Sequence, residues 1–138
     1  MTKKFIAGMV CIVQCSLGFA AEGASNLKGV WQLSEAYKNG KSITLKQPSA
    51  TKIYTERHVI YNYYARLPTC LSPALSAGFG SYTIAGASLS EIFSNESDPA
   101  AIGTTLDSTV SVSDDGDSLE KTYQREGRAH REVWTRLE

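Results

Sequence analysis

The chain has 138 residues, with 14 Lys or Arg against 14 Asp or Glu, so its formal net charge at pH 7 is zero. A chain of this length usually forms one domain. Its composition, 42% apolar and 20% charged, excludes collagen-like, disordered and coiled-coil proteins. The balanced charge lacks the strong basic field that non-specific nucleic-acid binding needs, so we expect no nucleic-acid partner.

The amino-terminal residues have the layout of a secretory signal peptide. Two lysines precede an apolar run from Phe5 to Phe19, and small residues follow around Ala20. We expect cleavage after Ala20, which makes residues 1–20 the signal peptide and residues 21–138 the mature domain. The sequence therefore predicts a periplasmic or secreted protein.

Two alternatives to a cleaved signal peptide are disfavoured. A retained membrane anchor would need roughly 20 apolar residues, whereas this run is about fifteen residues long and no second apolar stretch follows it. We therefore expect no integral membrane insertion after signal removal. A lipoprotein modified at Cys15 would have a small residue before the cysteine, and Gln14 occupies that position.

Removal of residues 1–20 leaves Cys70 as the single cysteine of the mature chain. An exported protein with one cysteine has no internal disulfide, so its stability must come from its core. Cys70 lies between two prolines in an expected loop, where we favour an unreactive half-buried thiol over intermolecular pairing. One cysteine and two histidines also argue against a zinc site, and we expect no metal and no cofactor.

The rest of the chain reads as a succession of short strands. Runs rich in β-branched and aromatic residues alternate with turn residues at intervals of about ten, which is typical of an all-β sandwich or barrel. The predicted strands are Val30 to Tyr37, Ser42 to Leu45, Thr51 to Thr55, His58 to Tyr64, Gly78 to Ile84, Leu89 to Ser94, Thr104 to Ser113, Ser118 to Gln124 and Arg131 to Leu137.

Turn residues separate these strands. Asn39-Gly40 is a strong hairpin signal, and glycines at positions 86 and 116 mark two more turns. Successive hairpins imply an antiparallel meander. Asp98 to Gly103 has an N-cap residue, a proline at the first helical position and a final glycine, which predicts a single helical turn. Residues 65–77 are predicted as the longest loop.

Alternation along each strand sorts the side chains to two faces. Trp31, Leu33, Glu35 and Tyr37 are expected on one face of the first strand. On later strands, Leu89, Glu91 and Phe93 share a face, as do Leu106, Ser108, Val110 and Val112, and as do His130, Glu132, Trp134 and Arg136. Several predicted interior faces therefore carry a carboxylate among aromatics, and a buried carboxylate must be paired or hydrogen-bonded.

The two ends of this β region resemble the lipocalin-like domains of small exported bacterial proteins. Gly29-Val30-Trp31 opens the region and Glu132-Val133-Trp134-Thr135-Arg136 closes it. The resemblance extends to Lys52-Ile53-Tyr54-Thr55 with His58 following, to Gly78-Phe79-Gly80-Ser81-Tyr82-Thr83, to Glu91 and to Gly103-Thr104. It covers most of residues 27–138.

The resemblance implies a single antiparallel up-and-down β-barrel of about eight strands. Trp31 of the first strand and Arg136 of the last would pack across the closed end, beside Trp134. The chain lacks the disulfide and the long C-terminal helix of true lipocalins. A barrel of about eight strands is either filled by its own side chains or holds one small ligand, and the residues leave both open.

The candidate ligand-binding residues are His58, Tyr61, Tyr63, Tyr82 and Glu91. Aromatic side chains with a polar tip suit a small apolar or aromatic-polar molecule. Alternation puts Tyr61 and Tyr63 on one face of their strand and His58 on the other, so without a bulge the site draws on one or the other. We favour His58 with Tyr82 and Glu91, because these match the family pattern more closely.

We interpret the chain as a non-enzymatic barrel that binds a small molecule. A small barrel enzyme with a His/Glu acid-base pair is the second hypothesis, although the sequence has no nucleophile elbow, phosphate loop or two-His metal motif, and no residue is assigned as catalytic. A packed barrel without a ligand, with a structural or partner-binding role, is the third.

Overall fold

The computed structural model describes residues 26–45, 47–66 and 73–138, and side chains at 64–66 and 73–75 are outside that description. The predicted signal peptide and Cys70 lie outside the described residues. The elements are β1 (Gly29–Lys38), β2 (Lys41–Ser42), β3 (Thr51–Tyr54), β4 (His58–Arg66), β5 (Pro73–Ala85), β6 (Ser88–Glu96), η1 (Pro99–Ala101), β7 (Thr105–Val112), β8 (Ser118–Arg125) and β9 (Arg128–Arg136).

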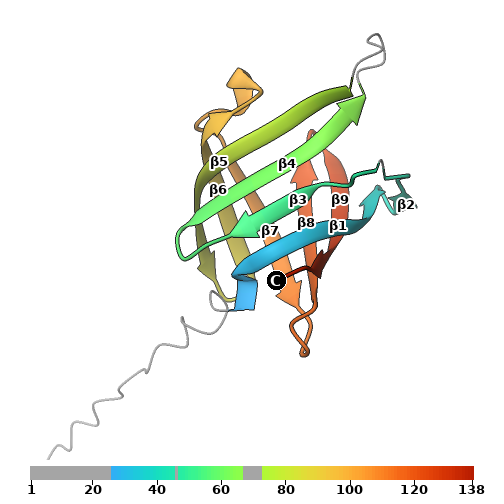
Figure 1. Cartoon of the computed structure of the whole chain (residues 1–138), viewed down its shortest axis with the longest axis vertical. Helices are drawn as coiled ribbons and strands as arrows, with labels where there is room; N and C mark the ends of the chain where they lie inside the picture. Colours follow the sequence, from blue (N-terminus) through green and yellow to red (C-terminus); the bar gives the residue numbers. More distant parts are fainter. Residues whose placement is uncertain (1–25, 46, 67–72) are drawn as a thin grey trace, which may run out of the picture.

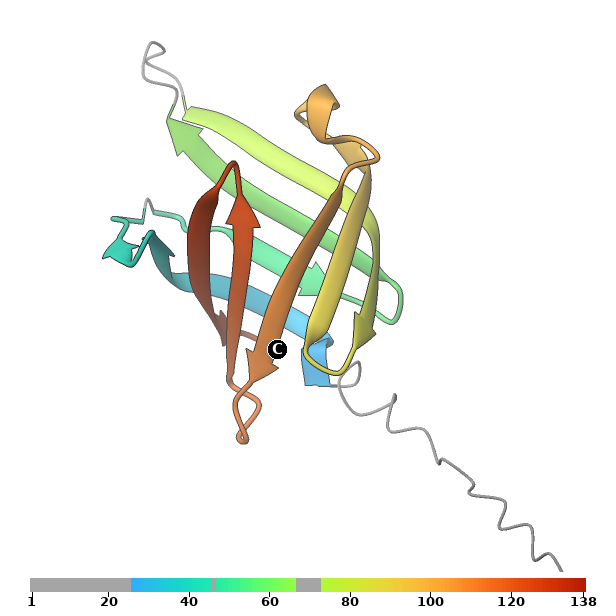
Figure 2. The ribbon, with the colours of Figure 1, turned by 180° about the vertical axis from the view of Figure 1, so that it is seen from behind.

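The described strands form one antiparallel sheet that closes on itself. Each strand from β3 to β8 pairs with the strand that follows it, and β1 pairs with β3. Pairing of β1 with β9 closes a barrel of eight strands in the described part of the chain (Figure 1). The short β2 pairs with β1 alone among them. Figure 2 shows the wall formed by β6 to β9 from behind. The predicted up-and-down barrel is confirmed.

Most predicted strands are found with ends shifted by a few residues, and two regions differ. The second predicted strand, Ser42 to Leu45, is reduced to the two residues of β2. The predicted loop over 65–77 is partly wrong, because β4 continues to Arg66 and β5 already begins at Pro73. Nine paired positions from His58 to Arg66 join these two strands, so pairing extends them beyond the β-rich runs.

The turns follow the predicted residues. Asn39 and Gly40 both have positive φ values, 50° and 75°, as a tight hairpin with two left-handed residues requires. The helical turn is the 3₁₀ helix η1, where the Asp98 side chain accepts a hydrogen bond from the Ala100 amide and Pro99 occupies the first turn. This turn lies in the connection between β6 and β7.

A bulge in β1 overturns the predicted face of that strand. Leu33 pairs with Trp134 and Glu35 pairs with the next residue, Val133, so Ser34 is the extra residue. Glu35 and Tyr37 therefore lie on the outer face, where the Tyr37 hydroxyl donates to Glu35 Oε2 at 2.6 Å. The expectation that they share a face with Trp31 is wrong beyond Leu33.

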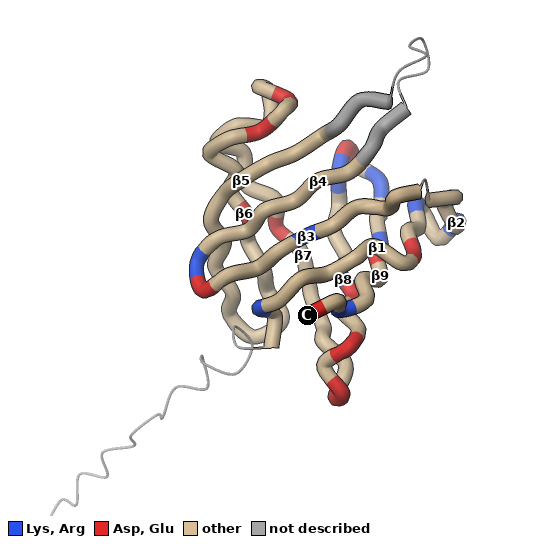
Figure 3. The backbone as a smooth tube through the Cα atoms, in the orientation of Figure 1, with Lys and Arg blue, Asp and Glu red and all other residues tan. Residues whose placement is uncertain are grey.

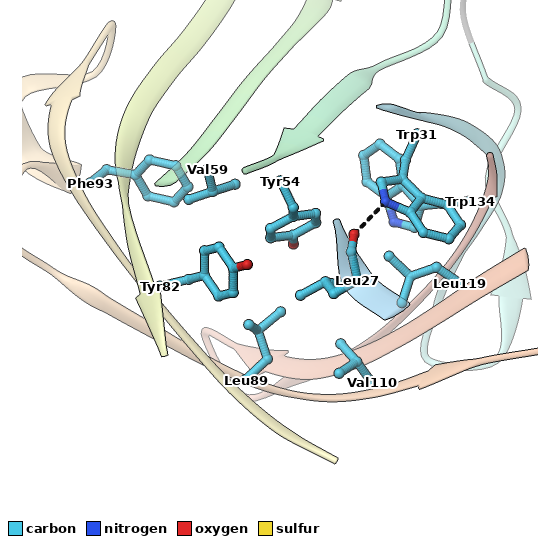
Figure 4. Packing of buried hydrophobic residues seen from close by; sticks show 10 residues of the cluster. All are labelled: Leu27, Trp31, Tyr54, Val59, Tyr82, Leu89, Phe93, Val110, Leu119 and Trp134. Atoms are coloured by element: carbon cyan, nitrogen blue, oxygen red, sulfur yellow. Dashed lines mark hydrogen bonds between the residues drawn. The ribbon is translucent and has the colours of Figure 1, made fainter. Parts of the chain in front are cut away.

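The apolar core fills one end of the barrel. This closed end carries residues 26–27 and the β5–β6 and β7–β8 turns, and the opposite, open end carries η1 and the β8–β9 turn (Figure 1). The core residues are Leu27, Trp31, Tyr54, Val59, Tyr82, Leu89, Phe93, Val110, Leu119 and Trp134 (Figure 4). Each comes from an inward-facing position or from the turn before β1, so the closed end is packed by the chain itself.

Trp31 and Arg136 join the first and last strands at this end. Trp31 is fully buried, and its indole nitrogen donates to the Leu27 carbonyl at 2.8 Å. The Arg136 guanidinium lies 4.1 Å from the centre of the Trp31 ring and also donates to the carbonyls of Lys28, Asn26 and Gly116. This is the pairing that the lipocalin-like resemblance implies.

Charged residues lie mainly at the turns and strand ends (Figure 3). Among the described residues, the charged side chains that are buried are those of Lys52 on β3, Glu91 and Glu96 on β6, and Lys121 on β8. A buried charge is costly unless it is paired, so these residues need partners inside the barrel.

Candidate functional site

A cavity of about 820 Å³ occupies the half of the barrel near the open end. Its rim includes η1 and the β8–β9 turn, and its floor reaches the charged residues near the barrel centre. The volume lies within the range of roughly 300 to 1,000 Å³ found for small-molecule sites. The barrel is thus packed at one end and hollow at the other.

The floor is organised around Glu91, which is fully buried. Its Oε1 accepts a hydrogen bond from the Tyr54 hydroxyl at 2.6 Å and one from Lys52 Nζ at 3.2 Å, and its Oε2 accepts one from Lys121 Nζ. Strands β3, β6 and β8 each supply a residue at an inward position, so the barrel brings together charges 30 and 39 residues apart in the chain.

These contacts shift the ionisation of the floor residues. Burial opposes the charged form of Glu91, but the ammonium groups of Lys52 and Lys121 and the two side-chain hydrogen bonds outweigh it and lower its pKa to about 2. Burial, reinforced by the Lys52 cation, lowers the pKa of Lys121 to about 8. The floor therefore holds an ionised carboxylate and two ammonium groups near pH 7.

A second carboxylate, Glu132 on β9, also contacts the cavity. Its Oε1 accepts from the Tyr123 hydroxyl at 2.7 Å and its Oε2 accepts from the Trp134 indole nitrogen at 3.1 Å. Burial and the Glu132 carboxylate raise the pKa of Tyr123. This hydrogen-bonded group fixes two aromatic side chains beside the charged floor.

One wall of the cavity is aromatic. Tyr63, 40% exposed, stacks on Tyr61 with ring centres 6.0 Å apart, and Phe93 meets Tyr61 edge-on at 5.0 Å. The Tyr61 hydroxyl donates to Glu96, and Gly78 leaves room for this pair, because a Cβ there would lie 2.5 Å from the Tyr61 ring. Burial and the hydrogen bond to Glu96 raise the pKa of Tyr61, so its hydroxyl stays protonated.

The structure brings together some of the predicted site residues and separates others. Tyr61, Tyr63 and Glu91 line the cavity. Tyr82 belongs to the packed closed end, where its hydroxyl donates to the Thr55 carbonyl at 2.7 Å and its ring meets Tyr54 edge-on.

The predicted inward position of His58 is wrong. His58 is exposed on the outer face of β4 and stacks on Phe79 at 5.2 Å, while its neighbour Val59 is buried in the core. Strict alternation along β4 then turns Tyr61 and Tyr63 inward with Val59. The favoured grouping of His58 with Tyr82 and Glu91 is therefore replaced by the tyrosine pair with Glu91; whether any of these residues binds a ligand stays a prediction.

Sequence reasoning missed the two lysines of the floor. Lys52 is two positions before the buried Tyr54, and Lys121 is two positions after the buried Leu119, so both share an inward face with an apolar residue. That alternation was a usable signal, but a lysine on a strand is ordinarily interpreted as solvated. His130, predicted on the same face as Glu132, stacks on Tyr123 with ring centres 4.9 Å apart.

Neither a metal-binding cluster nor a membrane-spanning helix is found among the described residues. In the part of the chain that the structure describes, no group of three His, Cys, Asp or Glu side chains is arranged to hold a metal ion. No helix among the same residues is long and apolar enough to cross a bilayer.

Solved structures resemble this barrel although no protein-family model and no curated protein matches the sequence. A lipocalin-like protein from Bacteroides uniformis matches with a TM-score of 0.58 and 19% identity, over 81% of this chain and 99% of that protein. An uncharacterized protein from Bacteroides eggerthii matches with a TM-score of 0.52 and 14% identity, over 80% of this chain and 99% of that one. The chain therefore has the lipocalin-like fold that its sequence resembles.

Proposed function

We propose that this protein is an exported lipocalin-like barrel that binds one small amphipathic molecule in the cavity at its open end. The observation that carries the proposal is the cavity of about 820 Å³ beside a packed core. A purely structural barrel of this size can fill its interior with its own side chains, as the closed end does. A hollow half with converging polar groups is instead the usual form of a ligand site.

The chemistry of the lining supports an amphipathic ligand. The stacked rings of Tyr63 and Tyr61 and the edge of Phe93 offer flat apolar area to a ring or a chain. The Lys52, Glu91 and Lys121 side chains at the floor offer charged hydrogen-bonding groups to a polar end. A molecule with one apolar part and one polar end would match both surfaces together.

A neutral fluorescent naphthalene probe, phenylnaphthylamine (NPN), tests the binding proposal. We expect one saturable site per chain, with fluorescence rising as the probe enters an apolar environment. Tyr63→Ala should weaken binding about 5- to 10-fold, because it removes a stacking surface worth on the order of 1 kcal/mol while leaving the Tyr61–Glu96 contact in place.

His58→Ala is the matched control, since His58 stacks on a ring at the outer face of the same strand. Its NPN affinity should equal that of the unaltered protein. An effect of His58→Ala without an effect of Tyr63→Ala would move the site to the outer face. No saturable binding of NPN would contradict the proposal and favour a barrel without a ligand.

Export is the second part of the proposal, and it rests on the signal-peptide layout of residues 1–20. Amino-terminal sequencing of exported protein should begin near Ala21, and high-salt washing should leave no membrane-embedded material. An intact Met1 on the exported protein would contradict cleavage. Native mass spectrometry of the same material would detect a small molecule that the barrel retains.

A further inference from the structure

The two lysines at the cavity floor have more hydrogen-bond donors than the described protein groups accept. A lysine ammonium has three N–H donors and no acceptor. Among the described residues, Lys52 Nζ and Lys121 Nζ each form one hydrogen bond, and both bonds go to Glu91. Each ammonium therefore keeps donors that no described protein group accepts, and both lysines line the cavity.

Every oxygen of the three buried or cavity-lining carboxylates Glu91, Glu96 and Glu132 already accepts a hydrogen bond. Glu91 accepts from Tyr54, Lys52 and Lys121. Each oxygen of Glu132 accepts from an aromatic side chain, and each oxygen of Glu96 also has a donor, with Tyr61 on one and Ser97 on the other. Each oxygen of these carboxylates thus already has a protein donor, whereas two of the three N–H donors of each ammonium have no acceptor among the described protein groups.

We infer that the cavity recognises a ligand with an anionic group, of the carboxylate or sulfonate class, which accepts hydrogen bonds from Lys52 and Lys121. This inference rests on the proposed function and specifies the polar end of its ligand. An amine or another donor group would have to share carboxylate oxygens that already accept from protein donors. An anion with two or three oxygens can contact both lysines, as Glu91 does, through charge-assisted hydrogen bonds.

The position of Lys52 fits this role. Its Nζ lies 6.0 Å from the centre of the Tyr61 ring and 5.4 Å from that of Trp134, so the cation sits where the aromatic wall meets the floor. An apolar body stacked along Tyr63 and Tyr61 would carry its terminal group toward Lys52. Lys121, at the other oxygen of Glu91, lies beside Tyr123 with its Nζ 5.6 Å from the ring centre.

Two probes with the same aromatic body test the inference. Anilinonaphthalene sulfonate (ANS) carries a sulfonate, and NPN lacks it. At pH 7 we expect ANS to bind at least about tenfold more tightly than NPN, which corresponds to about one charge-assisted contact. Equal affinities, or weaker binding of ANS, would overturn the anionic ligand while leaving the proposed function in place; absence of binding by both probes would contradict the function itself.

The pH profile of the unaltered protein is a second readout. Lys121 faces Glu91 on β6, Lys52 on β3 and Glu132 on β9, and its pKa is about 8. As the pH rises above that value the ammonium loses its proton, so ANS affinity should fall by up to about tenfold per pH unit, whereas NPN affinity should stay level. A level ANS profile from pH 7 to 10 would contradict a contact with the Lys121 ammonium.

Lys52→Met tests the other lysine and keeps one ammonium, Lys121, paired with Glu91. In this variant the affinity for ANS should fall about tenfold, and the affinity for NPN should stay unchanged. Lys28→Met is the matched control, because Lys28 pairs with Glu56 at 2.8 Å on the exposed surface and should leave both affinities unchanged. An unchanged ANS preference in folded Lys52→Met would overturn the assignment, and if that variant does not fold, the comparison of probes and the pH profile decide.

Discussion

Trp31→Ala should lower the free energy of unfolding by about 3 to 5 kcal/mol, the usual loss for truncating a large buried aromatic side chain. Trp31 is fully buried at the closed end, and the substitution removes its ring from the core and its hydrogen bond to the Leu27 carbonyl. Urea denaturation followed by circular dichroism measures the change. A loss below about 1 kcal/mol would show that the closed end does not depend on this residue.

The contact between Trp31 and Arg136 predicts coupling between their substitutions. Arg136→Ala should cost less than Trp31→Ala, and the double variant should lose about 0.5 to 2 kcal/mol less than the two losses added together. Arg131→Ala is the matched control, because Arg131 is another arginine of β9 that lies over a different ring, Tyr37, and pairs with Glu120. The losses in free energy of unfolding caused by Trp31→Ala and Arg131→Ala should be additive. Additive losses for Trp31→Ala and Arg136→Ala would contradict the contact between Trp31 and Arg136.

The strands and turns could be predicted from the sequence because their signals are local. Alternation of apolar and polar residues, with Asn39-Gly40 between two runs, is contained within a few residues of each element. The position of η1 followed in the same way from Asp98 and Pro99. Strand ends were less accurate, because β4 and β5 extend by pairing with each other into residues without a β-rich pattern.

The faces were predictable only where a strand is regular. The bulge at Ser34 arises where Glu35 pairs with Val133, about a hundred residues away in the chain. The residues of β1 alone give no signal that predicts it. On β4 the alternation was recognised, but the choice between its two faces followed the family pattern and favoured His58. The structure buries Val59 and exposes Ile60, two apolar neighbours that the sequence alone does not distinguish, and Tyr61 and Tyr63 follow the face of Val59.

The charged floor could not be derived in the same way, because its stability depends on distant partners. Lys121 is 1% exposed, a rare environment for lysine that the carboxylate of Glu91 makes tolerable. Each residue taken alone has an ordinary surface interpretation. The site appears only when closure of the barrel places β3, β6 and β8 around one interior.

Glu91→Gln should lower the free energy of unfolding by about 3 to 5 kcal/mol, the usual cost of removing one partner from a buried ion pair. The glutamine keeps the size of the side chain but leaves the ammonium groups of Lys52 and Lys121 without the carboxylate they share. Adding Lys121→Met to this variant should recover part of the loss, because it removes one of the two unpaired charges. Denaturant unfolding of the single and double variants at pH 7 measures both effects.

Glu96→Gln is the matched control on the same strand. Glu96 is also buried, but it accepts hydrogen bonds from Tyr61 and Ser97 and pairs with no lysine among the described residues, so its substitution should cost only about 1 kcal/mol. If Glu91→Gln and Glu96→Gln cost the same, the loss would reflect a hydrogen bond and the charges on the lysines would play no part.

Lowering the pH should remove the contribution of the ionised Glu91 carboxylate to the free energy of unfolding of the unaltered protein. The pKa of Glu91 is about 2 in the folded protein against an ordinary value of 4.5, so folding favours the ionised carboxylate. Its stabilisation, about 3 kcal/mol, is fully present above pH 4.5 and is lost as the pH falls toward 2. Glu91→Gln has no carboxylate to protonate at this position, so its stability should fall less over that interval. If the free energies of unfolding of the two proteins fall in parallel between pH 4.5 and 2, the lysines do not hold Glu91 ionised. The ion pairs of Glu91 with Lys52 and Lys121 would then not be what stabilises the cavity floor.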